Sequence, residues 1–148
     1  MSNGLTMSVN PSVASSVSIS SSNGSTICAG TSTTFTATPI NGGLTPTYLW
    51  QINGSTTGAN LPVLSTSGLQ NGDVVTCYMT SSASCPSPVT SASNSILMTV
   101  NPLVTPAISI VASEQMPVCV GTQVSFTATP QNGGSTPSYQ WKLNGSNV

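Results

Sequence analysis

Hydrophobic and polar residues alternate with a period of two along most of the chain, and no segment shows the spacing of an amphipathic helix. This alternation predicts short β-strands separated by residues that favour turns. We expect strands around residues 13–19, 33–37, 48–52, 61–69, 74–80 and 96–100. Turns are predicted at SNGS (22–25), at Pro39 with NGG (41–43), at Asn53–Gly54 and at NGD (71–73). The sequence therefore predicts an all-β fold.

A long stretch of the chain occurs twice. Residues 28–55 (CAGTSTTFTATPINGGLTPTYLWQINGS) return as residues 119–146 (CVGTQVSFTATPQNGGSTPSYQWKLNGS) without a gap. The offset from Cys28 to Cys119 is 91 residues, and every other landmark of the stretch keeps it. Tandem repeats of 91 residues are the simplest explanation of this pattern.

The same offset predicts how the chain is divided. SNGLTMSVNP at residues 2–11 matches SNSILMTVNP at 93–102, so residues 1–11 are expected to be the last strand of a preceding repeat. Residues 12–101 would then be one complete repeat, and residues 102–148 the first half of the next, with strands A–C only. We therefore expect a segment of a longer repetitive protein. The short joint at residues 101–102, which contains a proline, predicts a semi-rigid rod.

Seven or so short strands with a tryptophan in the third strand are typical of an immunoglobulin-like antiparallel β-sandwich. Tyr48, Trp50 and Ile52 share one face of that strand, and we expect this face to point into the core. The interpretation of Trp50 as core outweighs its interpretation as a sugar platform. The aromatic residues predicted as structural core are Phe35, Tyr48 and Trp50, with their counterparts Phe126, Tyr139 and Trp141.

Charge is nearly absent and excludes several classes of function. The chain has one Lys or Arg, two Asp or Glu and no His. No basic surface is available for nucleic acid, and no run of apolar residues is long enough to span a membrane. Acid–base catalysis, nucleophile activation and calcium binding all need more titratable groups than Asp73, Glu114 and Lys142 provide. We expect no catalytic residues, no metal site and no cofactor; Asp73 is interpreted as part of a turn.

One surface could bind a partner. If Val75, Cys77 and Met79 point inward, Tyr78 points outward beside Leu49 and Gln51 of the neighbouring strand. An exposed tyrosine among amides and hydroxyls suits a glycan or another protein, although most exposed tyrosines are simply part of a sheet surface.

The four cysteines, at positions 28, 77, 85 and 119, fit disulfides in an oxidising compartment better than a zinc site. In an immunoglobulin-like sandwich Cys28 and Cys77 would lie at the same end, which makes this pair geometrically natural. Cys85 would then be free or would bridge to a neighbouring repeat. The partner of Cys119 is expected beyond Val148.

The combined pattern ICAGTSxTFTATPxNGGxTPxYxWxxNGS, NGDVVTCxMTSxAxC and SNSIxMTVNP resembles the immunoglobulin- or PKD-like repeats of very large secreted surface proteins of Bacteroidetes. These include gliding-motility adhesins and cargo of the type 9 secretion system. The resemblance covers essentially the whole chain. It implies an extracellular location, an adhesive or spacer role and no catalytic residues. It also implies a disulfide between Cys28 and Cys85, so the pairing stays open at this point.

Three functions follow as hypotheses. The first is a structural and adhesive segment of a filamentous adhesin or its stalk, whose partners are neighbouring repeats and a polysaccharide or solid surface. The second is a spacer or carbohydrate-binding module of a secreted polysaccharide-degrading enzyme. The third is a subunit of a self-assembling extracellular filament, which would require neighbouring copies to complete the half-repeat.

Overall fold

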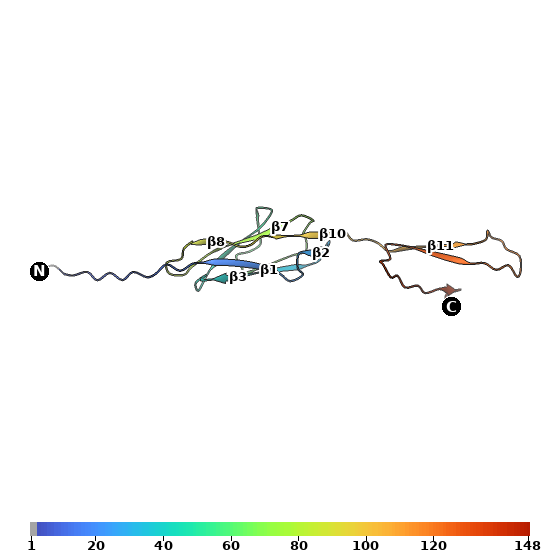
Figure 1. The fold of residues 1–148 in the computed structure, drawn as a ribbon, viewed down its shortest axis with the longest axis horizontal. Coiled ribbons are helices and arrows are strands. Elements are labelled where there is room, and N and C mark those ends of the chain that lie inside the picture. Colours follow the sequence, from blue (N-terminus) through green and yellow to red (C-terminus); the bar gives the residue numbers. More distant parts are fainter. Residues whose placement is uncertain (1–2) are drawn as a thin grey trace. The chain divides into compact units, whose positions relative to one another are not determined.

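The computed structural model describes residues 3–148, which form fourteen β-strands and no helix (Figure 1). The chain divides into two compact units, which we call unit 1 (Met1–Pro102) and unit 2 (Leu103–Val148). The predicted all-β class is therefore confirmed for this part of the chain. No helix capable of crossing a membrane occurs among residues 3–148.

The first sheet of unit 1 has three antiparallel strands in the order β1–β3–β6. They are β1 (Ser16–Ser21), β3 (Thr33–Ile40) and β6 (Val63–Thr66). The strict alternation of Val17 and Ile19 with serine buries one face of β1 and exposes the other. The outer face of this sheet consequently carries mostly hydroxyl side chains.

The second sheet of unit 1 has the order β5–β4–β7–β8, and a short fifth strand also pairs with β7. All of its pairings are antiparallel. Its strands are β5 (Ser55–Thr57), β4 (Thr47–Ile52), β7 (Val74–Thr80), β8 (Thr90–Ala92) and β9 (Ile96–Leu97). The central strand β7 coincides with the predicted strand at residues 74–80.

A separate parallel pair lies at one end of unit 1. It joins β2 (Thr26–Cys28) to β10 (Thr99–Asn101), with Val100 opposite Ile27. The predicted strand at residues 96–100 is thus divided in two. The division occurs because Met98 bonds through its backbone to the turn at residues 72–73, with its N–H donated to Asp73 O at 2.7 Å. The segment leaves β7 at that point and continues along β2.

One hydrophobic core lies between the two sheets of unit 1. Val17, Ile19 and Phe35 come from the first sheet, and Trp50 and Val75 from the second. Phe35 and Trp50 are completely buried, and Trp50 Nε1–H donates a hydrogen bond of 2.9 Å to the Leu61 carbonyl. Two sheets that share one core are consistent with a β-sandwich.

Unit 2 contains two antiparallel hairpin-like pairs. Strand β11 (Ala107–Ala112) pairs with β12 (Phe126–Gln131), and β13 (Lys142–Leu143) pairs with β14 (Ser146–Asn147). The register of β11 with β12 places Ala107 opposite Gln131.

The aromatic residues of unit 2 differ from the prediction. Phe126, Tyr139 and Trp141, expected in a core, are 53%, 46% and 37% exposed. The reason is that the second sheet of unit 2, formed by β13 and β14 with two residues each, is too small to cover β11 and β12. Apolar side chains that alternate correctly along a strand remain on the surface when nothing covers that face.

Candidate functional site

The strongest candidate for a binding surface is the outer face of the sheet formed by β4, β7 and β8. Leu49 and Tyr78 lie directly opposite each other in the register of β4 with β7. Leu49 is 44% exposed and Tyr78 37%, whereas Trp50 and Cys77, the next pair along, are fully buried. The structure therefore brings two of the predicted surface residues together as one exposed apolar and aromatic pair.

Polar but uncharged side chains surround this pair. Gln51, the third predicted residue, lies opposite Thr76 and is half-buried. Thr47 lies opposite Thr80, and the hydroxyl groups of Thr80 and Thr90 are 3.1 Å apart. The threonines were not singled out from the sequence, although their alternation with Val75, Cys77 and Met79 already indicated the outer face.

This face offers an aromatic ring together with neutral hydroxyl and amide groups. An aromatic ring with flanking hydroxyl and amide groups offers stacking and hydrogen bonds to a neutral partner such as a sugar. No acid, base or activated nucleophile lies in the pairs that border Tyr78, which are Leu49, Thr76, Thr80 and Ala92. Its contacts would consequently be weak individually and independent of charge.

Asp73 connects two turns. Its Oδ1 accepts a hydrogen bond of 2.8 Å from Asn53 Nδ2, and its Oδ2 accepts one of 2.8 Å from the Gln70 N–H. Asn53 in turn accepts the Val74 N–H at its own Oδ1 at 2.9 Å. The side-chain oxygens of Asp73 are thus engaged in holding the turn after β4 against the turn before β7, which is a structural role.

All four cysteines are free thiols in the structure. The predicted Cys28–Cys77 bond is absent because Cys77 points into the core, whereas Cys28 is exposed on β2 beside the buried Ile27. Alternation along β2 directs the Cys28 side chain away from the core.

The alternative Cys28–Cys85 pair is also absent, because these residues lie at opposite ends of unit 1. The Ala29 N–H donates a hydrogen bond to the Asn101 carbonyl, which holds the adjacent Cys28 near Asn101. The turn after Ala29 leads to the start of β3. The backbone carbonyl of Cys85 accepts a hydrogen bond from the Val13 N–H, near the other end of β3. Eight residues of strand span about 25 Å, whereas a disulfide needs Cα atoms within about 7 Å. A bond to a neighbouring repeat stays a prediction.

Burial raises the pKa of the Cys77 thiol to about 11, although a hydrogen bond involving the Leu49 backbone opposes the rise. We expect unit 1 to lose stability as the pH rises from about 9 to about 11. Below this window the thiol is protonated in both states. Within it the unfolded chain ionises first, so deprotonation favours unfolding. The measurement is the thermal unfolding midpoint as a function of pH.

Cys77→Ala should flatten this alkaline decline, while the exposed control Cys85→Ala should leave it unchanged. Part of the decline should persist in Cys77→Ala, because burial also raises the pKa of Tyr48. Equal pH profiles for wild type and Cys77→Ala would contradict the assignment.

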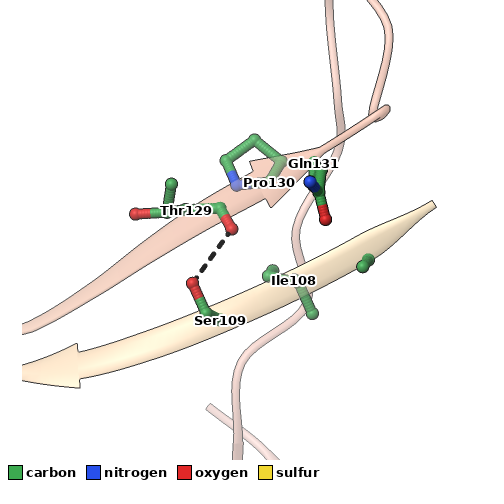
Figure 2. A pocket seen from close by; sticks show the side chains of 6 residues that line it. Ile108, Ser109, Thr129, Pro130 and Gln131 are labelled. Atoms are coloured by element: carbon green, nitrogen blue, oxygen red, sulfur yellow. Dashed lines mark hydrogen bonds between the residues drawn. The ribbon is translucent and has the colours of Figure 1, made fainter.

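No group of three or more His, Cys, Asp or Glu residues that could hold a metal ion occurs in residues 3–148. A hollow of about 410 Å³ lies over the β11–β12 pair in unit 2. Figure 2 shows that Ile108, Ser109, Thr129, Pro130 and Gln131 line it, with Ser109 Oγ donating to the Thr129 carbonyl at 3.5 Å. None of these side chains is titratable.

Comparisons with known proteins identify no relative. No protein-family model, no curated protein and no solved structure matches this chain. The arguments about function consequently rest on the sequence pattern and on the structure.

Proposed function

We propose that this chain is a structural and adhesive segment of a large secreted bacterial cell-surface protein, built from immunoglobulin-like repeats of 91 residues. The first observation that supports this proposal is the backbone pairing of the strands in the two sequence copies. Strands β1 and β3 place Ser16 opposite Ile40, and β11 and β12 place Ala107 opposite Gln131, which is 91 residues later on both strands. Equal registers at equal offsets are expected when two sequence copies fold by the same rules.

The turns support the same proposal. Asn41 and Asn132, at the same offset, take positive φ angles of 53° and 54°. Each donates its Nδ2 group to the backbone carbonyl that precedes the first strand of its unit, at Ala14 and at Thr105. A left-handed asparagine that bonds back to the chain is specific turn chemistry, because few other residues adopt this conformation readily.

The exposed pair of Leu49 and Tyr78 carries the adhesive part of the proposal. A single pair of this size supports only weak binding, but a repetitive protein presents the corresponding sheet face many times, with Gln140 at the position of Leu49 in the second copy of the sequence. Linked weak sites raise the overall avidity by about 10²–10⁴-fold when the geometry allows simultaneous contact. An uncharged face also keeps its contacts when the ionic strength changes.

The test compares the chain as single molecules with four copies held on a tetrameric carrier. We expect only the tetravalent form to be retained on a polysaccharide-coated or apolar surface, as measured by surface plasmon resonance. Tyr78→Ala should shorten its retention by about fivefold, the equivalent of about 1 kcal/mol for a lost aromatic contact. The control is Ile40→Ala, which removes a 59% exposed side chain from the other sheet.

Equal retention of the single and the tetravalent form would contradict an adhesive role for this face. An equal loss of retention in the Tyr78 and Ile40 variants would contradict it as well.

A second candidate is a spacer or carbohydrate-binding module of a secreted polysaccharide-degrading enzyme. The hydroxyl and amide groups around Tyr78 favour it, and competition by soluble polysaccharide alone would support it over general adhesion.

A further inference from the structure

Two segments of unit 1 that are far apart in the sequence lie side by side along its length. We call residues 13–29 the entry segment and residues 85–101 the exit segment, because the chain enters unit 1 through one and leaves toward unit 2 through the other. The paired backbone at both ends of this contact is parallel. In Figure 1, β1 leads to β2 in the same direction as β8 leads to β10. The two segments therefore run alongside each other in the same direction.

Backbone hydrogen bonds join the two segments at both ends. At one end, the Val13 N–H donates to the Cys85 carbonyl at 3.0 Å, and the Val13 carbonyl accepts the Ser87 N–H at 2.8 Å. At the other end, β2 pairs with β10, and the Ala29 N–H donates to the Asn101 carbonyl at 2.8 Å. The contact thus extends over the whole length of both segments.

Side chains continue the contact between these ends. The hydroxyl group of Ser91 donates to the Ser15 carbonyl at 2.8 Å, and both side chains are buried. Asn94 bonds twice to Ile19 of the edge strand β1: its Oδ1 accepts the Ile19 N–H at 2.8 Å, and its Nδ2 donates to the Ile19 carbonyl at 3.1 Å. One asparagine side chain thereby satisfies both backbone groups that a neighbouring strand would otherwise pair with.

Tension reaches unit 1 at the points where the chain enters and leaves it. A pull at these two points draws the entry segment toward one end of unit 1 and the exit segment toward the other. The bonds between the segments lie across the direction of this pull, so they are loaded together, whereas a peeling force loads them one after another. Forced unfolding is governed by the unfolding rate, and bonds that must break together raise the barrier to unfolding.

We propose that the entry and exit segments form a shear contact that resists tension along the chain. This inference rests on the proposed function, because a stalk or adhesive segment is held between a cell and a surface. The side chains of the contact are serine and asparagine, which carry no charge, so its strength should depend little on salt. A shear contact lets the segment transmit force without unfolding.

The first test compares two directions of pull on the whole chain at constant force in magnetic tweezers. One molecule is held at its two termini, and the other at its N-terminus and at the exposed thiol of Cys85, with Cys28 and Cys119 replaced by serine. The second geometry peels the contact, because Val13 and Cys85 lie at the same end of it. Unit 1 is recognised by a gain in length of roughly 200–300 Å. It should unfold at least about tenfold more slowly when held at the termini, because several hydrogen bonds then break together.

The second test uses a pair of matched asparagines in the molecule held at its termini. Asn94→Ala removes two bonds of the shear contact and should raise the unfolding rate by about tenfold. The control Asn60→Ala removes a bond of 2.6 Å from the Tyr48 N–H, which lies outside the contact, and should leave the rate under force unchanged. Ser91→Ala repeats the test at another bond of the contact.

Equal unfolding rates in the two directions of pull would overturn the proposal, because the bonds would then stabilise the fold without bearing tension as a group. It would also be overturned if Asn94→Ala and Ser91→Ala changed the rate under force no more than Asn60→Ala does. The force measurements involve no ligand, so the shear contact and the binding role of the Tyr78 face can each fail alone.

Discussion

Replacement of Trp50 by alanine should lower the free energy of unfolding of unit 1 by about 3–5 kcal/mol. Trp50 is the largest completely buried side chain, and it lies in β4 at the centre of the second sheet. Truncation leaves a cavity in the core that also contains Phe35 and Val75, and it removes the hydrogen bond from Nε1–H to the Leu61 carbonyl. The measurement is urea unfolding followed by circular dichroism.

Trp141→Ala is the matched control for Trp50→Ala, because the same residue type occurs 91 positions later but is 37% exposed. We expect this change to leave the unfolding transition of unit 1 unaltered. Equal loss of stability from the two substitutions would show that the burial difference does not determine the energetics, and the core assignment would be wrong.

Strands were predictable from the sequence where alternation is long and turns are unambiguous. The segment VVTCYMT alternates over seven residues between a turn and a polar loop, and β7 occupies it completely. By contrast, β2, β5 and β8 were not predicted. Each has three residues, too few for a periodic pattern, and each exists because a neighbouring strand offers backbone partners. The hydrogen-bond partners of such strands are set by the tertiary fold.

Burial was less predictable than strand position, because burial needs a covering surface. The same alternation, Phe-Thr-Ala-Thr, occurs from Phe35 and from Phe126, yet Phe35 is enclosed and Phe126 is 53% exposed. A pattern states which face of a strand is apolar, but the presence of a second layer decides whether that face is buried.

The candidate site was also predictable only in part from the sequence. Alternation along β7 assigned Tyr78 to the outer face, and the exposure of its side chain agrees with this. The direct pairing of Tyr78 with Leu49 depends on the register between two strands that are separated by 21 residues (74 − 52 − 1). Similarly, the spacing of Cys28 and Cys85 could not indicate that they lie at opposite ends of unit 1.

Gly43→Ala is the second substitution expected to have a large effect, at about 2–4 kcal/mol of lost stability in unit 1. Gly43 has a φ of +80°, a conformation that is costly for a residue with a side chain. A Cβ atom added there would also come far inside van der Waals contact of the Ser82 side chain and the Ala83 backbone N. The strain of the turn and the steric clash act together.

The clash should cost stability because hydrogen bonds hold the segment around Ser82 in place. Ser82 donates its N–H to the Gly42 carbonyl at 2.8 Å, and its Oγ accepts the Thr45 N–H at 2.9 Å. A shift that made room for the new methyl group would break these bonds between the β3–β4 turn and the end of β7. Loss of stability should therefore be accompanied by faster amide hydrogen exchange at Ser82 and Thr45.

Gly24→Ala is the control that separates the two causes. Gly24 belongs to the same unit and has a φ of +68°, but a Cβ there would meet nothing within 4 Å. It should cost only about 1 kcal/mol, which is the penalty of the left-handed conformation. If Gly43→Ala cost no more than Gly24→Ala in urea unfolding followed by circular dichroism, the close packing of the turn against Ser82 and Ala83 would be refuted. A larger cost for Gly43→Ala would assign the difference to the contact of this turn with Ser82 and Ala83.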